Sequence, residues 1–169
     1  SANGRIANLI VHQATVDEGM QIRDCTDCVI EYNYVYDTIG DGINLCCGST
    51  GGLIQFNEAN DIDSENAAIY IYDAEYTTIQ CNLIDGTSRN EGIKFGQKYG
   101  PDALKNGGSI LYNTITNTAQ DGIAVYMGNT TVSGNDISYS SSEHGAIYVT
   151  HGVANVGITD DTIHDNTCS

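Results

Sequence analysis

Carboxylates recur at one position in this chain, immediately before short apolar segments. Glu91, Asp121 and Asp41 each stand directly before a Gly-Ile pair. Two carboxyl groups held about 5 to 9.5 Å apart can cleave a glycosidic bond, with one as acid and the other as base or nucleophile. A like-charged neighbour also raises the pKa of one carboxyl group, which suits a general acid. We take these three residues as candidate catalytic groups, with ordinary Asp-Gly and Glu-Gly turn chemistry as the alternative.

Lys94 is a rare cation close to these carboxylates in the sequence. The chain has 22 Asp and Glu residues against 6 Lys and Arg residues, a net charge of −16. A lyase acting on a uronate polymer needs a base or a neutralising charge near the substrate carboxylate. Lys94 is therefore a fourth catalytic candidate, and a surface lysine that balances Glu91 is the alternative.

The apolar segments that follow the carboxylates are copies of one short pattern. Each copy has Gly or Ala, then Ile or Met, then any residue, then an aliphatic residue or Phe. The last residues of successive copies lie 23, 26, 24, 30 and 24 positions apart. Self-similarity at such a period indicates a repeat architecture. The six copies are Gly19–Ile22, Gly42–Leu45, Ala68–Ile71, Gly92–Phe95, Gly122–Val125 and Ala146–Val149.

A second repeated element alternates with the first and places an Asn between two apolar residues. Clear copies have their Asn at 33, 82, 113 and 135, with a variant at Asn57. Arg5…Asn8…Ile10 is an imperfect first copy, and Ile158…Asp161…Ile163 is a last copy with Asp in place of Asn. Apolar residues alternate with period 2 in both elements, which predicts strands with one inward face. The same alternation predicts that the residues just before the Asn point inward, namely Tyr32, Phe56, Cys81 and Tyr112.

Three short strands per repeat can form a coil in which each strand pairs in parallel with its counterpart one turn later, and the recurring Asn stacks on itself. These features resemble the right-handed parallel β-helix of pectate-lyase-like proteins over about residues 5–165. The resemblance implies an all-β solenoid of about six to seven rungs with an Asn ladder. We expect one domain over residues 1–169, with an inserted loop at 97–107, as a fragment of a longer protein or a stacking unit.

In this fold the outward side chains of one sheet form a groove suited to polymers. The outward positions of the Gly-Ile segments place aromatic and amide side chains along such a groove. Tyrosine can stack on sugar rings at a wet surface, although it also has a high strand propensity. The candidate substrate-binding residues are Asn44, Tyr70, Tyr72, Tyr126 and Tyr148.

Four of the six cysteines cluster just beyond two consecutive repeat strands. They are Cys25, Cys28, Cys46 and Cys47. We expect disulfides between rungs, which would place the protein in an oxidising compartment, and a single zinc site is the alternative.

A pair of aspartates is a candidate calcium site. Asp61 and Asp63 could hold Ca²⁺ through hard oxygen ligands, or they could be solvated acidic turn residues.

The composition limits the partners of this chain. The strong negative charge excludes nucleic acid, which needs a basic footprint, and disfavours unaided binding of an acidic polymer. No apolar run approaches the length of a membrane span.

Two functions remain. The resemblance to polysaccharide lyases, polygalacturonase-type hydrolases and the archaeal disaggregatase group implies an extracellular or cell-surface protein that binds or processes polysaccharide. The alternative is a non-catalytic surface or sheath protein that assembles end to end into filaments, or one flanked by further domains.

Overall fold

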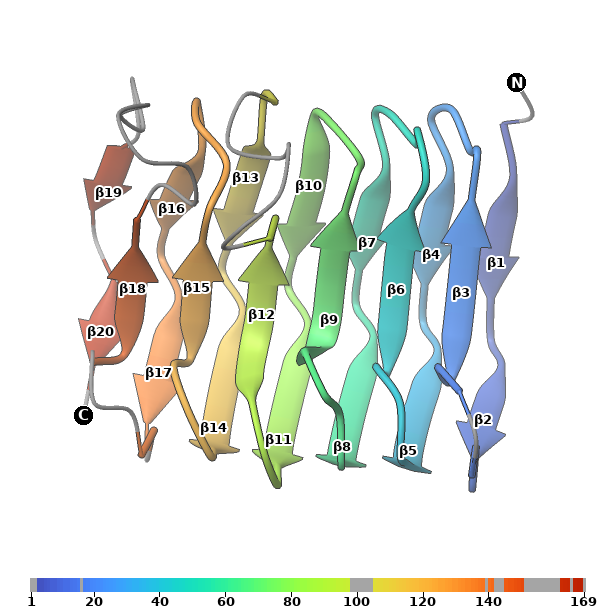
Figure 1. Ribbon diagram of the computed structural model, residues 1–169, viewed down its shortest axis with the longest axis horizontal. Helices are drawn as coiled ribbons and strands as arrows, with labels where there is room; N and C mark the ends of the chain where they lie inside the picture. Colours follow the sequence, from blue (N-terminus) through green and yellow to red (C-terminus); the bar gives the residue numbers. More distant parts are fainter. Residues whose placement is uncertain are drawn as a thin grey trace.

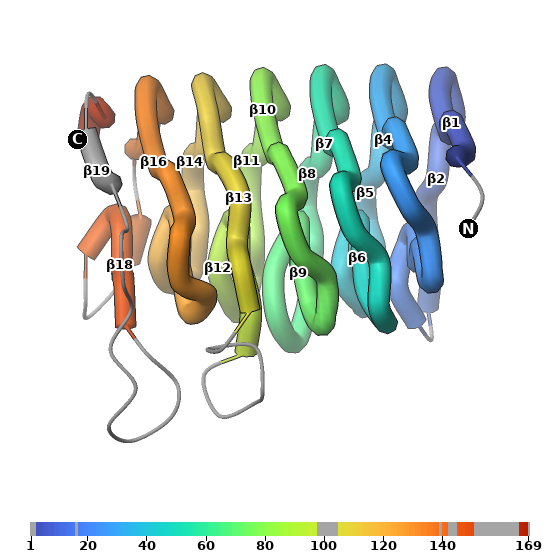
Figure 2. The backbone as a smooth tube through the Cα atoms, turned by 90° about the horizontal axis from the view of Figure 1, so that it is seen from above, coloured from blue at the N-terminus to red at the C-terminus, as the bar shows by residue number. Residues whose placement is uncertain are grey.

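The computed structural model describes residues 3–15, 17–97, 105–138, 140–141, 145–150, 162–164 and 166–168. The chain coils into a right-handed parallel β-helix, so that successive turns lie side by side along one axis (Figures 1 and 2). Each full turn contributes one strand to each of three parallel sheets. This confirms the predicted fold class and the resemblance to parallel β-helix proteins. No helix among the described residues is long and apolar enough to cross a membrane.

Each sheet contains every third strand of the chain, which is the signature of the solenoid. The first sheet holds β1 (Arg5–Ala7), β4 (Val29–Glu31), β7 (Leu53–Gln55), β10 (Thr77–Gln80), β13 (Gly108–Leu111), β16 (Thr131–Ser133) and β19 (Thr162–His164). The second holds β2 (Ile10–His12), β5 (Tyr34–Thr38), β8 (Glu58–Ile62), β11 (Leu83–Thr87), β14 (Thr114–Thr118), β17 (Asp136–Ser138) and β20 (Thr167–Cys168). The third holds β3 (Met20–Arg23), β6 (Ile43–Cys46), β9 (Ala67–Tyr72), β12 (Glu91–Phe95), β15 (Ile123–Val125) and β18 (Ile147–Val149).

The core consists of columns of equivalent apolar side chains, one from each turn. Ile43 pairs with Ile69, which pairs with Ile93, and all three are completely buried. The predicted stacks through the Gly-Ile segments are confirmed over all six copies. Burial of a branched or aromatic side chain contributes about 1.5 to 3 kcal/mol. The columns therefore supply the main apolar stabilisation of the coil.

The small first residue of each copy, Gly in four copies and Ala in two, lets neighbouring turns approach closely. A Cβ atom added at Gly92 would lie 2.7 Å from the carbonyl oxygen of Gly122 and 2.6 Å from the Ile115 side chain. Such contacts force neighbouring atoms to shift, so the small residue keeps two turns at sheet spacing.

An asparagine ladder runs through the interior beside the bend between the first and second sheets. The Nδ2 group of Asn57 donates to Oδ1 of Asn82 at 3.0 Å, and Asn82 donates to Asn113 at 3.0 Å. The second Nδ2 hydrogen of each Asn bonds a carbonyl of the preceding turn, as Asn82 does with Ile54 at 3.0 Å. These amides are buried, and their hydrogen bonds keep the interior polar groups satisfied. The full ladder is Asn33, Asn57, Asn82, Asn113, Asn135 and Asn166.

The two ends of this ladder differ from the sequence prediction. Ile6, not Arg5, pairs with Ile30, and the backbone N–H of Leu9 donates to Asn33. Leu9 therefore occupies the Asn position of the first turn, one residue later than Asn8.

At the other end, Ile163 pairs with Val132, so the last ladder residue is Asn166. The predicted member Asp161 lies outside the described residues. Both errors are shifts of phase in copies whose Asn motif is degenerate.

The residues just before the ladder point outward, contrary to the predicted alternation. Tyr32, Phe56 and Tyr112 are exposed, and the Tyr32 and Phe56 rings stack with centroids 5.2 Å apart. All three have left-handed backbone angles, with φ between 53° and 55°. A left-handed residue bends the chain from the first sheet into the second, which breaks the period-2 alternation. Cys81 has the same angle, φ 53°, and is only partly buried.

Replacing a central ladder residue should destabilise the protein strongly. Asn82→Ala removes the acceptor used by Asn57 and the donor used by Asn113 and by the carbonyl of Ile54. Buried groups left without partners cost about 1 to 3 kcal/mol each, so we expect the free energy of unfolding to fall by about 2 to 4 kcal/mol. Urea denaturation followed by circular dichroism measures this change.

The matched control is Asn60→Ala, on the outward face of β8. Asn60 donates to Glu58 at 2.8 Å and takes no part in the ladder, so its loss should change stability by no more than about 0.5 kcal/mol. Equal losses for the two variants would show that the ladder makes no special contribution.

Candidate functional site

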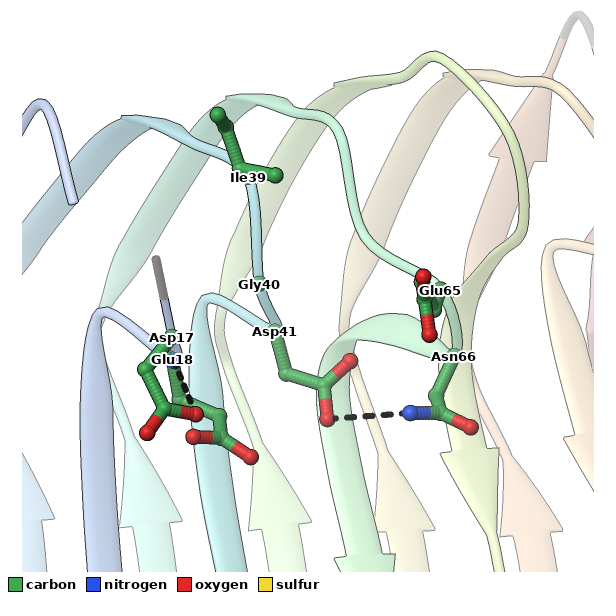
Figure 3. Close-up of a pocket in the computed structure, with 7 residues that line it drawn as sticks. All are labelled: Asp17, Glu18, Ile39, Gly40, Asp41, Glu65 and Asn66. Atoms are coloured by element: carbon green, nitrogen blue, oxygen red, sulfur yellow. Dashed lines mark hydrogen bonds between the residues drawn. The ribbon is translucent and has the colours of Figure 1, made fainter. Parts of the chain in front are cut away.

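The outward face of the third sheet carries a cleft over β3, β6 and β9, and Gln97, two residues beyond β12, also lines it. It consists of two cavities of about 220 and 330 Å³ that share Glu18, Asp41 and Asn66. The smaller cavity lies where the chain enters β3, β6 and β9 (Figure 3). The larger cavity continues along the strands, and Asn44, Tyr70, Tyr72 and Gln97 are among its lining residues. The repeat itself produces this arrangement, because equivalent outward residues of successive strands fall beside one another.

Asp41 is the polar anchor of this cleft. Its buried carboxylate accepts hydrogen bonds from the Asn44 amide at 3.0 Å and from the backbone N–H of Ala67 at 3.2 Å. The Ser64 hydroxyl and the Asn66 amide donate to it as well. Four donors from two turns fix this carboxylate, so Asp41 positions the lining more readily than it could transfer a proton.

Glu91 and Asp121 occupy neighbouring turns, as predicted. Glu91 pairs with Ala67 in the strand of the preceding turn. On the other side, the backbone N–H of Gly92 donates a hydrogen bond to the carbonyl oxygen of Asp121 in the following turn. Both carboxylates are almost completely buried, at 4% and 1% exposure. Asp41 lies two turns from Glu91, also as predicted.

Lys94 lies between Glu91 and the cleft. Its Nζ is 3.8 Å from Oε2 of Glu91 and 5.7 Å from the centre of the Tyr70 ring. Burial raises the pKa of Glu91, and the Asp121 carboxylate adds to this shift, while Lys94 opposes it. Glu91 is therefore held closer to the protonated form that a general acid needs.

Oδ1 of Asn44, in the cleft lining, is buried without a hydrogen-bond partner, and only 4% of the Asn44 surface is exposed. Oε2 of Glu91 is equally buried and faces Lys94 Nζ at 3.8 Å. Buried polar atoms are hydrogen-bonded in more than nine of ten cases, so an orphan acceptor indicates a place where a ligand can donate. Asn44 lines the larger cavity, whereas Glu91 lines neither cavity and lies on the strand next to that of Tyr70.

The tyrosines predicted to bind substrate are not equally accessible. Tyr70 and Tyr126 are almost fully buried, at 3% and 4% exposure, whereas Tyr72 and Tyr148 are half-buried. Tyr72 stacks on Tyr70 with centroids 6.0 Å apart, and Tyr148 meets Tyr126 edge-on at 6.1 Å. Tyr72 lines the cleft and offers the accessible ring there.

Several cleft residues escaped the sequence-based selection. Asp17 and Glu65 line the smaller cavity from the turns before β3 and β9, and Asn66 joins the two cavities. These turns do not match the repeat pattern, so periodicity gives no signal for them. Glu18 shares the repeat position of Asp41 and could have been selected on that ground. Burial raises its pKa, and the adjacent Asp17 carboxylate adds to the effect.

The cysteine prediction is wrong. The six cysteines all lie in described segments and none of them is joined in a disulfide, so the predicted disulfides do not form. Cys46 and Cys47 contact each other, with Sγ atoms 2.7 Å apart, instead of reaching the cysteines of another turn. Burial raises the pKa of Cys28 and of Cys46 to about 12, which disfavours the thiolate that disulfide exchange needs. Among the described residues no three Cys, His, Asp or Glu side chains gather as the alternative zinc site would require.

The proposed metal ligands lie away from the cleft, at the end of β8. Nε of Arg89 lies 2.7 Å from Oδ1 of Asp63, whose carboxylate also accepts the Ser88 hydroxyl. Asp61 is exposed at a left-handed position, with φ 50°. In the described part of the chain no three His, Cys, Asp or Glu side chains gather as a metal site. The pair therefore has no third ligand of these types there.

Comparison with known proteins supports the fold assignment. No protein-family model and no curated protein matches the sequence. Among solved structures, the chain is similar to the A-module of the mannuronan C-5 epimerase AlgE4 from Azotobacter vinelandii, with a TM-score of 0.57 and 17% identity. The match covers 96% of this chain and 54% of that one, so this chain spans about half the length of the module. The two proteins share the parallel β-helix fold.

The pH dependence of stability should reveal the environment of Glu91. Because its pKa is raised above the ordinary value of 4.5, Glu91 favours folding below that pH, and this contribution is lost as the pH rises through the folded-state pKa. As the pH rises from about 4 to 8, the free energy of unfolding of Glu91→Gln should therefore increase relative to that of the parent. Urea unfolding at a series of pH values measures it.

Asp85→Asn is the control with the opposite sign. Hydrogen bonds from Asn117 and Thr116 lower the pKa of Asp85 below 3.8, so its contribution is present above that pH and lost in acid. Its stability difference should move in favour of the parent as the pH rises from strong acid to about 4, and should stay constant above that pH. Parallel pH curves for the two variants would contradict the burial of Glu91.

Proposed function

We propose that this protein binds polysaccharide in the cleft of the third sheet and processes it with Glu91 as the proton-transferring group. The main support is the orphan acceptor Asn44 Oδ1, which lines the larger cavity together with the accessible Tyr72 ring. Sugar hydroxyls can donate to such oxygens, while the apolar face of a sugar packs on an aromatic ring. The fold shared with a polysaccharide-modifying epimerase module supports the same class of ligand.

The chemistry proposed for Glu91 is general acid catalysis. A protonated carboxyl group can donate to the glycosidic oxygen of a leaving sugar, and Asp121 on the adjacent turn is the partner carboxylate. Adjacent turns are about 4.8 Å apart, which lies near the spacing used when the second carboxylate acts as nucleophile. Lys94 holds Glu91 in place and could offset negative charge that develops on the substrate.

We further propose a location outside the cell or at its surface, where polysaccharide is available. This proposal rests on the ligand class alone, since the predicted disulfides do not form. The single domain over residues 1–169 and the insertion at 97–107 also remain proposals. Residues 98–104 of that insertion lie outside the described residues.

Truncation of the accessible cleft tyrosine should weaken glycan binding. We expect Tyr72→Ala to raise the dissociation constant about tenfold, because a sugar–aromatic contact contributes on the order of 1 kcal/mol. Affinity gel electrophoresis against soluble polysaccharides measures the change. The matched control is Tyr36→Ala, which removes a stacked, half-buried tyrosine from the outward face of the second sheet. If Tyr72→Ala and Tyr36→Ala raise the dissociation constant equally, the glycan does not bind in the cleft.

Replacement of the proposed acid should separate turnover from binding. Glu91→Gln should lower the release of reducing ends or unsaturated sugars at least about 100-fold, while the dissociation constant changes little. Glu58→Gln on β8 is the control and should leave turnover unchanged. Full turnover by Glu91→Gln would eliminate the proposed acid. If the protein binds no glycan and sediments as rods, the proposed function is wrong and the structural, filament-forming alternative is favoured.

A further inference from the structure

We infer that the cleft selects glycans that carry hydrogen-bond donors and no carboxylate, and that it rejects polyuronates. This inference rests on the proposed function and specifies its substrate class. It also distinguishes this protein from the module it resembles, which is named for mannuronan, a uronate polymer.

The first ground is the distribution of charge around the cleft. Four carboxylates line the smaller cavity, from Asp17, Glu18, Asp41 and Glu65, and no cation is among its described lining residues (Figure 3). Like charges a few ångströms apart repel by about 1 kcal/mol in water and by more in a partly enclosed site. Each uronate residue entering this cavity would add another negative charge beside existing ones.

The two nearest cations do little to reverse this field. Lys94 is half-buried, lines neither cavity and lies 3.8 Å from Oε2 of Glu91. Arg23 is the one cation among the described residues that line the larger cavity, where Glu18 and Asp41 also lie. The local charge therefore agrees in sign with the net charge of −16 for the whole chain. Among the described lining residues an acidic polymer finds no compensating patch.

The second and independent ground is the orientation of the amides. Asn44 and Asn66 both direct Nδ2 toward Asp41, at 3.0 and 3.4 Å. Their donor ends are thus turned to the protein, and Oδ1 of Asn44 is left buried without a donor. An ionised carboxylate can only accept hydrogen bonds, so the charged group of a uronate cannot pair with this oxygen, whereas its hydroxyls can. A hydroxyl or an amine can donate to it.

The two sources of this ligand chemistry are neutral glycans and amino-sugar glycans. The test compares hydroxyethylcellulose and galactomannan, which are neutral, with chitosan, alginate and polygalacturonate in buffer containing a chelator. We expect the best neutral or amine-bearing glycan to bind at least about tenfold more tightly than either polyuronate at low ionic strength. Binding that weakens with salt identifies the amine source, and salt-independent binding identifies the neutral source.

Charge reversal in the cleft provides the directed test. Glu18→Lys combined with Glu65→Lys should improve polyuronate binding at least about fivefold at low salt, and less at high salt. Glu58→Lys combined with Asp136→Lys makes the same change in net charge on the second sheet and should have no such effect. In the parent chain, added NaCl should strengthen the retention of polyuronates by screening repulsion, which tests the inference without any substitution.

The outcomes distinguish the inference from the proposed function. Polyuronate binding as tight as that of the best other glycan, with chelator or with Ca²⁺ added, overturns the inference and leaves the proposed function standing. An absence of binding to every glycan overturns the proposed function itself.

Discussion

Every feature of this protein depends on one constraint, the parallel pairing of each turn with its own equivalent in the next turn. The pairing places identical positions about 4.8 Å apart along the axis, so that inward residues stack into columns and the ladder asparagines meet. A turn with the wrong phase would lose its backbone pairing, its column and its amide partner together. The three interactions therefore reinforce a single register, and the coil needs no other tertiary contacts to define it.

The same constraint creates the candidate site. Outward residues of the third sheet also fall into rows, and these rows contain carboxylates, amides and tyrosines that are far apart in the sequence. Asn44, Tyr70 and Lys94 become consecutive neighbours in this way. Burial then changes their chemistry, because Glu91 loses water and gains a like-charged neighbour. A repetitive scaffold thus acquires a local environment that differs from one turn to the next.

The fold is predictable from the sequence because several copies of the same motif independently indicate the same strand arrangement. Six copies of the Gly-Ile segment fix the third sheet, and the clear Asn copies fix the ladder. Prediction was less successful where a single residue departs from regular alternation. Tyr32 and Phe56 were expected inside, but a left-handed backbone turns them outward, and a pattern of polarity does not report backbone angles.

The candidate site was predicted only in part for a related reason. The adjacency of Glu91 and Asp121 follows from the register and was foreseen, as was the distance in turns to Asp41. The solvent accessibility of each tyrosine cannot be predicted from the repeat, because it depends on how neighbouring side chains cover the surface. Asp17, Glu65 and Asn66 lie in irregular turns whose approach to one another is decided by the whole coil.

The ladder of asparagines also has a direction. Every Oδ1 from Asn33 through Asn166 accepts from the preceding turn, and an Nδ2 hydrogen of each ladder residue from Asn33 through Asn135 donates to the following one. Amide dipoles aligned in this way add head to tail and polarise one another, as peptide dipoles do along a helix. The column of amides therefore has a net dipole, with its acceptor oxygens directed toward the first turn and its donor N–H groups directed toward the last. Any rung that extends it must enter with the same polarity, so two such columns can join head to tail but never head to head.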